Sequence, residues 1–218
     1  MGGANTRQAL FMVTRFPRPG RTKTRLIPAL GAEGAAQLQR QMTEHLLQKF
    51  QPLCHRQGLT FEVHFAGGST AQMLQWLGPQ VNLKPQCQGD LGRRLSHVFD
   101  QGFAAGLERI LVVGSDCPAI EAAQILQALE RLNSHDVVLG PAEDGGYYLV
   151  GLRAAQPALF QGVHWGQDCV LHQTVAIAAR RRLAVGLLPP LPDIDRPEDL
   201  PLWRGYDRDS SSRPQMRS

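Results

Sequence analysis

The sequence predicts an α/β protein of one domain, with a mostly parallel central sheet covered by helices on both faces. Three observations predict this class. Short runs of aliphatic and β-branched residues alternate along the chain with longer segments of helical periodicity. The run 110–114 contains no polar side chain, which is expected of a strand buried on both faces. A chain of 218 residues with 43% apolar residues is long enough to bury one substantial core.

The expected elements follow from these runs in chain order. The strands are expected at 9–13, 60–66, 81–85, 110–114, 136–139, 147–151 and 184–188. The helices are expected at 33–54, 70–77, 91–106, 119–132 and 168–181. Strands that alternate with helices are joined by crossover connections, which make neighbouring strands parallel. We expect the domain to cover 1–203 and the segment 204–218, rich in Ser, Arg and Asp, to be a disordered tail.

Composition and charge restrict the class of function. The net charge is only +4 and the basic residues are clustered, which favours a local anionic ligand over a nucleic-acid partner. Residues 1–7 are polar, unlike a signal peptide, and no apolar stretch approaches the length of a membrane span. The four cysteines are too far apart for a zinc site. We therefore expect a cytoplasmic protein, whose oligomeric state the sequence leaves open.

The segment 15–26, called the basic loop below, is the most informative feature of the chain. Its sequence RFPRPGRTKTRL holds five cations and no acid within eleven residues, and its glycine and prolines exclude a continuous helix in the first half. Guanidinium groups such as those of Arg15 and Arg25 clamp phosphate oxygens, and Lys23 supplies a compact charge. The loop therefore fits a di- or triphosphate, although a solvated basic connector would have the same composition.

Asp116 follows the expected strand 110–114 directly. Ligands of open α/β sheets bind beyond the carboxyl ends of the strands, so this carboxylate should face the ligand crevice. A carboxylate opposite bound phosphates is a suitable ligand for Mg²⁺ or Mn²⁺. Asp116 would serve equally well as a cap for a helix that begins after Pro118. Both interpretations remain open at this stage.

A second cluster, 140–149, also follows an expected strand. Glu143 and Asp144 place two carboxylates at the rim of the crevice, and Gly145 with Gly146 permits a close backbone approach. A plain Asp-Gly hairpin turn explains the same residues. Such a turn would still aim Asp144 into the crevice.

A glycine-containing segment, 88–94, is expected to lead into the helix 91–106. Asp90 is a natural N-cap for that helix. The functional alternative is a loop whose backbone amides, together with Arg93 or Arg94, contact a nucleotide or its phosphates.

The segment 193–200 contains two carboxylates two positions apart. Alternate side chains of an extended segment share one face, so Asp193 and Asp195 are expected to point the same way. Either of them could complete a metal site with Asp116. The alternative for Asp195 is helix capping.

In this order the motifs resemble DUF2064, a family also described as radical-SAM/selenodomain-associated transferase 1. It belongs to the nucleotide-diphospho-sugar transferase superfamily, which has the GT-A fold, and is similar to the phospholactate guanylyltransferases. The motifs that carry the resemblance lie in 17–26, 88–92, 114–118, 140–148 and 193–200. Two departures stand out. Gln167 follows Trp165-Gly166 where the family commonly has Thr, and Arg15 stands where it often has Lys.

The resemblance implies a divalent-metal-dependent transferase with a nucleotide donor and a small-molecule acceptor. It implies metal ligation by Asp116 and Asp195, with Mg²⁺ or Mn²⁺ as cofactor, and catalysis by Asp116, Asp144 and Lys23. The implied nucleotide and phosphate contacts are Arg15, Pro19, Gly20, Lys23, Arg25, Gly89, Asp90, Arg93 and Ser115. The implied acceptor or sugar contacts are Asp144, Gly145, Gly146, Tyr147 and Trp165.

Two reactions fit this arrangement. In glycosyl transfer the donor is a nucleotide-diphospho-sugar, and the carboxylate and aromatic groups of 144–148 suit a sugar. In nucleotidyl transfer a phosphorylated acceptor attacks the α-phosphate of a triphosphate, which the five cations of the basic loop would suit. The sequence slightly favours glycosyl transfer. A non-catalytic nucleotide-binding module is a third possibility, but such a module should have lost the acids at the strand ends, and here they are all present.

Overall fold

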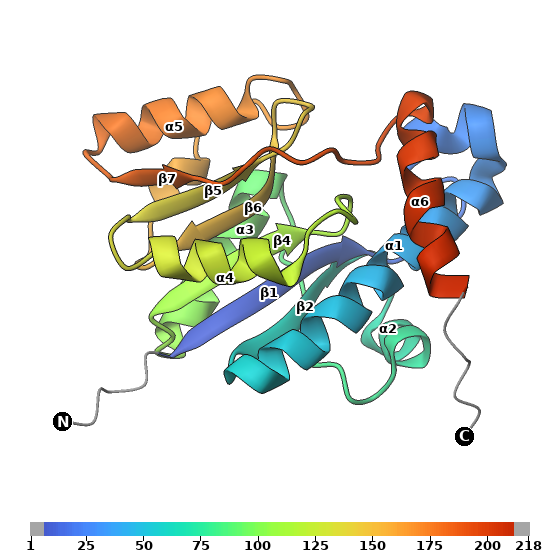
Figure 1. The fold of residues 1–218 in the computed structure, drawn as a ribbon, viewed down its shortest axis with the longest axis horizontal. Coiled ribbons are helices and arrows are strands. Elements are labelled where there is room, and N and C mark those ends of the chain that lie inside the picture. Colours follow the sequence, from blue (N-terminus) through green and yellow to red (C-terminus); the bar gives the residue numbers. More distant parts are fainter. Residues whose placement is uncertain (1–6, 212–218) are drawn as a thin grey trace.

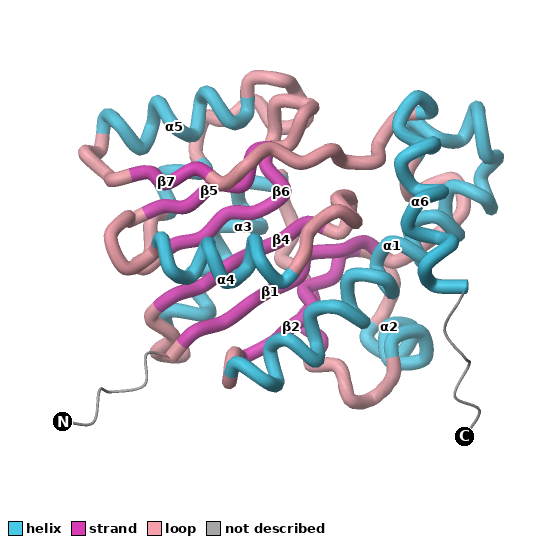
Figure 2. Tube along the Cα trace, in the orientation of Figure 1, coloured by secondary structure: helices cyan, strands magenta, loops and turns pink. Residues whose placement is uncertain are grey.

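A seven-stranded sheet forms the centre of the protein, shown by a computed structural model that describes residues 7–211 (Figure 1). The strands are β1 (Gln8–Arg15), β2 (Thr60–Ala66), β3 (Leu83–Pro85), β4 (Arg109–Gly114), β5 (Val137–Pro141), β6 (Tyr147–Leu152) and β7 (Val185–Leu187). Their order in the sheet is β3-β2-β1-β4-β6-β5-β7. Only β6 runs antiparallel to its neighbours, β4 and β5, so the expected mostly parallel α/β sheet is confirmed. Figure 2 shows the strands in magenta with the helices in cyan around them.

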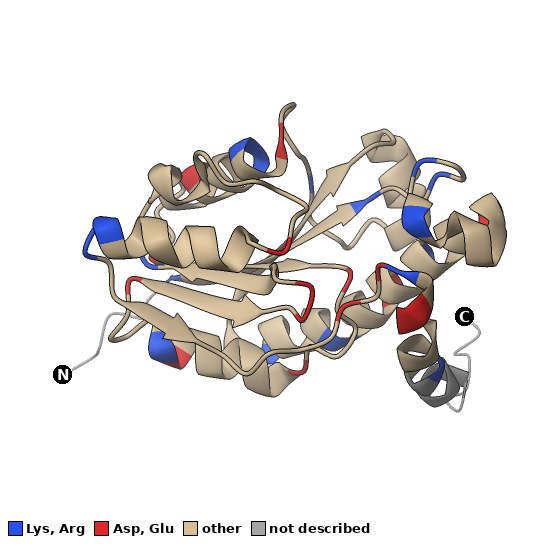
Figure 3. Ribbon diagram, turned by 90° about the horizontal axis from the view of Figure 1, so that it is seen from above, with Lys and Arg blue, Asp and Glu red and all other residues tan. Residues whose placement is uncertain are grey.

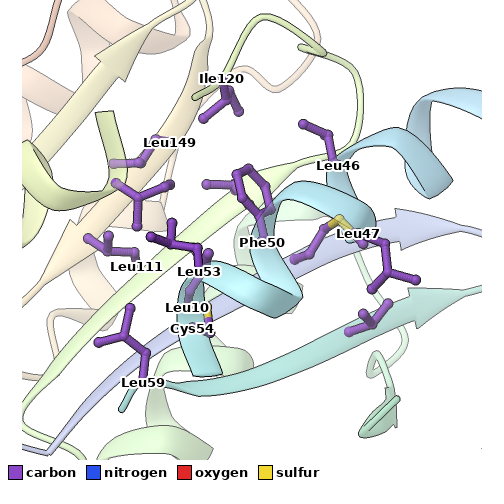
Figure 4. Close-up of a cluster of buried hydrophobic side chains, with 14 of the residues drawn as sticks. Leu10, Leu46, Leu47, Phe50, Leu53, Cys54, Leu59, Leu111, Ile120 and Leu149 are labelled. Carbon is purple, nitrogen blue, oxygen red and sulfur yellow. The ribbon is translucent and has the colours of Figure 1, made fainter. Parts of the chain in front are cut away.

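Helices cover both faces of this sheet. They are α1 (Ile27–Gln57), α2 (Thr70–Leu77), α3 (Leu91–Ala104), α4 (Ala122–Arg131), α5 (Val170–Arg180) and α6 (Leu200–Ser211), with short 3₁₀ turns η1 (Thr24–Leu26), η2 (Pro157–Phe160) and η3 (Pro197–Asp199). Side chains of α1, α2 and α4 pack on one face, and side chains of α3 and α5 pack on the other. Figure 4 shows part of the first cluster, with Phe50 of α1 among aliphatic side chains.

Three helix starts differ from the sequence-based expectation, and the smallest difference is that α5 begins at Val170 rather than at residue 168. Helix α1 begins at Ile27 rather than at residue 33, because Pro28 suits a first turn and a kink at Gly31, with φ of 70°, joins the two parts of the helix. Helix α4 begins at Ala122, where Glu121 caps it. Helix α2 has the expected bounds, and Ser69 and Gln72 form a capping box at its start.

The carboxyl-terminal segment is the main departure. Residues 204–211, expected to be part of a disordered tail, belong to helix α6, while 212–218 lie outside the described residues. Trp203 is 8% exposed and joins a third buried cluster with Leu26 and Ile194. Burial of this large aromatic side chain stabilises a helix that local sequence pattern does not reveal. The expected domain boundary at residue 203 therefore falls inside a helix.

In the part of the chain that the structure describes, none of the helices combines the length and the apolar character that crossing a membrane requires.

Candidate nucleotide site

A cavity of about 630 Å³ opens at the edge of the sheet where the parallel strands end. It is lined by the basic loop, the end of β4, the turn between β5 and β6, and residues 193–195, called the acidic segment below. Figure 3 shows acidic residues on several loops at this edge. The predicted site residues that line the cavity are Arg15, Lys23, Arg25, Ser115, Asp116, Asp144, Gly146, Tyr147, Trp165 and Asp195.

The remaining predicted residues lie outside this lining. They are Pro19, Gly20, Gly89, Asp90, Arg93 and Gly145. Asp90 caps helix α3, since its Oδ1 atom accepts a hydrogen bond of 2.8 Å from the backbone nitrogen of Arg93. Arg94, rather than Arg93, lines the cavity. Nucleotide contacts of these outlying residues stay predictions.

The basic loop is held in shape by a buried threonine. The hydroxyl of Thr22, 2% exposed, donates to the carbonyl of Phe16 (3.0 Å) and accepts from the backbone nitrogen of Arg18 (3.2 Å). Lys23 follows in the left-handed region with φ of 49°, which is unusual for a residue other than glycine. This conformation turns the chain from the loop into η1. Strain of this kind is retained where the surrounding contacts fix it.

Lys23 reaches into the acidic side of the cavity. Its Nζ atom lies 3.0 Å from Oδ1 of Asp116 and 3.5 Å from Oδ1 of Asp195, and it donates to the carbonyl of Ile194 at 2.5 Å. The side chain is only 3% exposed, whereas that of Asp116 is 50% exposed. A buried ammonium group is stable when carboxylates surround it, and Lys23 has two. It therefore serves as counter-ion to the acids at the strand ends.

Both carboxylate oxygens of Asp195 lie next to cationic side chains. Its Oδ2 atom accepts a hydrogen bond of 2.5 Å from Nη1 of Arg25, and its Oδ1 atom faces Lys23. Asp195 does not take the alternative role of a helix cap, because the N-cap position of η3 is Arg196 and Asp199 is the third residue of that turn. The Oδ2 atom of Asp199 accepts from the backbone nitrogens of Asp195 (3.0 Å) and Arg196 (2.7 Å).

The carboxylate of Asp193 carries an electrostatic penalty in the folded protein. Burial raises its pKa to about 6, with further contributions from the negative charges of Asp144 and Asp116, while Lys23 acts in the opposite direction. Carboxylates gathered in this way attract a cation. Asp116 does not cap α4, since Glu121 occupies that position, so its half-exposed carboxylate remains available to the cavity.

The turn between β5 and β6 has the predicted Asp-Gly form. Oδ1 of Asp144 accepts a hydrogen bond of 2.8 Å from the backbone nitrogen of Gly146. Gly145 has φ of 88°, and a Cβ atom there would lie 2.0 Å from the carbonyl oxygen of Asp168. Only glycine fits this position. The turn places Asp144 in the cavity lining, so the structural and functional interpretations of this motif hold together.

A buried polar network that the sequence does not reveal joins three elements behind the cavity. Gln39 of α1, 3% exposed, directs its Nε2 atom at the hydroxyls of Ser115 (2.8 Å), Thr43 (3.2 Å) and Thr14 (3.3 Å). Thr14 precedes Arg15, and Ser115 precedes Asp116. Gln39 therefore fixes the end of β1 against the end of β4. A single glutamine within a helix gives no local signal for this role.

An aromatic corner occupies the other side of the cavity. The rings of Tyr147 and Trp165 meet edge to face with centroids 6.3 Å apart, and both line the cavity. Burial raises the pKa of Tyr147, which keeps the phenol neutral. Gly92 of α3 lies so close to Trp165 that a Cβ atom would approach Nε1 to 2.7 Å. Gln167, at the position where the family commonly has Thr, also lines the cavity.

Cys117 lines the same cavity but is 2% exposed. Burial raises the pKa of its thiol to about 12. The thiol is therefore protonated at neutral pH and is a poor nucleophile.

The donor set fits a hard divalent cation only in part. Asp116 and Asp193 offer carboxylate oxygens, the ligands that Mg²⁺ and Mn²⁺ prefer. Among the described residues, however, there is no group of three or more acidic, histidine or cysteine side chains arranged to hold a metal. Oxygen atoms of a bound phosphate would have to supply further ligands, as is usual for Mg²⁺ at nucleotide sites.

The fold defines a class, the GT-A-like transferases, and comparisons with known proteins agree. A crystal structure from Desulfovibrio desulfuricans G20, described as a putative nucleotide-diphospho-sugar transferase, matches with a TM-score of 0.85 and 33% identity over 94% of this chain and 90% of that one. The profile of the family described as "Uncharacterized protein conserved in bacteria (DUF2064)" matches residues 35–167. The chain belongs to this family, as its motifs predicted.

Two further similarities are less extensive. The 3-phospho-D-glycerate guanylyltransferase of Phenylobacterium zucineum (strain HLK1) is 35% identical over 129 residues, which is 56% of this chain and 56% of that protein. The chain thus matches little more than half the length of this curated relative. Glucosyl-3-phosphoglycerate synthase from Mycobacterium tuberculosis, solved with Mn²⁺ and UDP, shares the fold with a TM-score of 0.57 and 10% identity.

Proposed function

We propose that this chain is a divalent-metal-dependent nucleotidyltransferase, which joins the nucleoside monophosphate part of a nucleoside triphosphate to a small anionic acceptor and releases pyrophosphate. The observation that carries the proposal is the single cavity lined by both the basic loop and the carboxylates of Asp116 and Asp193. The cations of the basic loop would hold the phosphates of the nucleotide, and the two carboxylates would hold a divalent metal.

The balance of cations supports a triphosphate over a diphosphate. Lys23 and Arg25 are engaged with Asp116 and Asp195, but Arg15 and Arg21 also line the cavity. These two guanidinium groups suit the β- and γ-phosphates, where bidentate pairs are strong. The 35% identical guanylyltransferase supports the same reaction. The slight preference of the sequence for glycosyl transfer is thus reversed in our proposal.

In this reaction an oxygen of the acceptor attacks the α-phosphorus, and the bond from that phosphorus to the bridging oxygen of the β-phosphate breaks. The electron pair of that bond leaves with pyrophosphate. An acceptor that attacks through a phosphate or carboxylate oxyanion needs no general base. Arg15 and Arg21 would hold the departing pyrophosphate, while Lys23 would stabilise negative charge that develops at the α-phosphate.

The proposed cofactor is Mg²⁺ or Mn²⁺, which when bound supplies Lewis-acid and templating chemistry at the phosphates. Asp116 and Asp193 would hold it. Asp195, the ligand implied by the resemblance, is the weaker candidate because both of its oxygens already face cations. The protein then acts in the cytoplasm on small molecules.

The second candidate is glycosyl transfer. The aromatic corner of Tyr147 and Trp165 beside Asp144 offers the surfaces that sugars often contact, and the similar D. desulfuricans protein carries a nucleotide-diphospho-sugar description. The same basic loop would then hold a nucleoside diphosphate as leaving group.

A release assay distinguishes the two reactions. The chain is incubated with each α-labelled nucleoside triphosphate, 3-phosphoglycerate and related anionic acceptors, and Mn²⁺ or Mg²⁺, and pyrophosphate is measured. We expect one triphosphate to yield pyrophosphate and a labelled conjugate, and EDTA to abolish both. Release of a nucleoside diphosphate from a nucleotide sugar, with no pyrophosphate from any triphosphate, would overturn the proposal in favour of glycosyl transfer.

Variants of the basic loop test which of its cations contact the triphosphate. Loss of one charge-assisted contact corresponds to about 1.5–3 kcal/mol, so Arg15→Ala and Arg21→Ala should each weaken triphosphate binding roughly 10- to 100-fold. Arg56→Ala removes an exposed cation near the far end of α1 and serves as the matched control. Equal affinities of all three variants would contradict the assigned phosphate contacts.

A further inference from the structure

Ile194 is the point at which the acidic segment is tied to the rest of the cavity. Its backbone nitrogen donates to the carbonyl of Asp116 at 2.9 Å, and its carbonyl accepts from Nζ of Lys23 at 2.5 Å. Asp193 and Asp195 flank it in the chain. The position of this one residue therefore sets the positions of a lysine and three carboxylates.

The side chain of Ile194 is not supported by either main face of the sheet. It is 1% exposed and lies in the third buried cluster together with Leu26 of η1, at 0%, and Trp203 of α6, at 8%. Leu26 directly follows Arg25, the partner of Asp195. The third cluster thus lies beneath both the basic loop and the acidic segment, and α6 closes it.

The start of α6 is coupled to the acidic segment through the backbone as well. Asp199, immediately before α6, accepts hydrogen bonds from the backbone nitrogens of Asp195 and Arg196. Figure 1 shows α6 lying against the first part of α1. The α1 residues Ala35, Leu38 and Met42 complete the cluster.

A second contact joins α6 to the segment that follows Asp116. Nζ of Lys49 donates to the carbonyls of Pro118 (3.0 Å) and Ile120 (3.4 Å) and lies 5.7 Å from the centre of the Tyr206 ring. Helix α6 therefore approaches the Asp116 turn through Lys49 and the acidic segment through Trp203.

From these contacts we propose that Trp203 is a positioning residue of the cavity: by holding Ile194 and Leu26 it keeps Lys23, Asp116 and the acidic segment in the arrangement that binds the nucleotide. The proposal rests on the proposed function for its ligand, a metal-bound nucleoside triphosphate. Among the residues whose side chains the structure describes, neither of the two large clusters on the sheet includes one from α6, so we expect the core of the sheet to form without Trp203.

The first test measures how accessible the Lys23 side chain is in the absence of any ligand. In the parent chain the Lys23 side chain is 3% exposed, so an amine-reactive reagent followed by peptide mass spectrometry should label it slowly. We expect Trp203→Ala to raise the labelling rate of Lys23 at least tenfold and Trp203→Phe to restore most of the protection. Leu202→Ala, which truncates a side chain 43% exposed on the same helix, is the matched control.

The second test measures the affinity of the protein for the nucleotide. Trp203→Ala should weaken binding of the cognate triphosphate with Mn²⁺ about tenfold, with Trp203→Phe and Leu202→Ala close to the parent. Unchanged Lys23 labelling in folded Trp203→Ala would overturn the positioning role. If Trp203→Ala does not fold, Ile194→Ala is measured in the same way, and unchanged labelling there would overturn it too.

The two tests separate the two proposals. Suppose that Trp203→Ala labels Lys23 faster but the parent protein binds no nucleoside triphosphate. This result would support the positioning role and refute the proposed function. Suppose instead that Trp203→Ala labels Lys23 at the parent rate, while the parent protein binds a triphosphate and releases pyrophosphate. This result would refute the positioning role alone.

Discussion

The ammonium nitrogen of Lys23 lies 3.0 Å from the Oδ1 atom of Asp116, and this ion pair joins the basic loop to the end of β4. It also places a fixed protein cation among carboxylates that suit a metal. If the proposed function holds, a metal–nucleotide complex would have to share these carboxylates with Lys23 or displace it from them.

Lys23→Met tests this relationship. The variant keeps the length of the side chain but removes its charge, so Asp116 and Ile194 lose a buried partner. Loss of one partner of a buried pair costs several kcal/mol, and because Asp116 is half exposed we expect a loss of about 2 kcal/mol in the free energy of unfolding. Thermal unfolding in EDTA measures it.

The same variant should respond more strongly to Mn²⁺ than the parent does, because a divalent cation no longer competes with the ammonium group. Lys84→Met, which removes an exposed lysine on β3, is the control. Stability in EDTA equal to that of the parent would show that Lys23 contributes no net stabilisation.

Gln39→Ala should affect both stability and binding. The substitution removes the donor that faces Ser115, Thr43 and Thr14 and leaves a small cavity in the polar network. We expect the free energy of unfolding to fall by about 2 kcal/mol. Since Thr14 and Ser115 precede Arg15 and Asp116, affinity for the cognate triphosphate should fall as well. Gln48→Ala, exposed on the same helix, should change neither quantity in denaturant and binding titrations.

The effect of Asp193→Asn on the stability of the protein should depend on pH. The pKa of Asp193 is raised to about 6, so the folded state binds a proton more tightly than the unfolded state. The stabilisation that this carboxyl contributes is complete below pH about 4 and is lost as the pH rises through about 6. The variant and the parent should therefore have similar stability near pH 4, and the variant should be the more stable at pH 8.

The size of this effect follows from the two pKa values. Their full difference corresponds to about 3 kcal/mol, and partial exposure to solvent reduces the expected gain to roughly 1 kcal/mol. Thermal unfolding across this pH range in EDTA measures it. A variant less stable than the parent at pH 8 would contradict the electrostatic penalty assigned to Asp193.

Gly92→Ala should displace Trp165. Replacing a glycine inside a helix with alanine usually raises the free energy of unfolding by about 0.5–1 kcal/mol. Here the new Cβ atom would lie 2.4 Å from the carbonyl oxygen of Phe160 and 2.7 Å from Nε1 of Trp165. We expect a net loss of about 1–3 kcal/mol and a changed tryptophan fluorescence spectrum. Gln101→Ala, exposed on the same helix, should leave the spectrum unchanged.

The sequence was a sufficient guide for two elements whose signals are local. Helix α2 has the expected bounds because its capping box and apolar spacing lie within a few residues of each other. Strand β2 likewise matches its prediction. The motif order also predicted that the basic loop and Asp116 would meet in one cavity, because both follow strands that end at the same edge of the sheet.

The features that were missed depend on contacts between distant parts of the chain. Helix α6 is stabilised by burial of Trp203 against α1, and a polar segment rich in Ser and Asp gives no indication of it. The charges of the basic loop indicated phosphate binding but not that Lys23 is engaged with Asp116 and Asp195. Gln39 acquires its role only when β1, β4 and α1 are packed together.

The acidic segment lies about 170 residues after the basic loop in the chain, which has a consequence for the order in which the cavity is assembled. During synthesis the basic loop and β4 leave the ribosome well before residues 193–203 do. Domains form from the amino terminus onward as the chain emerges. A nascent chain can therefore assemble most of its sheet while Lys23 still lacks the carbonyl of Ile194 and the carboxylate of Asp195. Lys23 gains these partners, and the cavity its full lining, only after residues 193–203 have emerged and Trp203 can pack against α1.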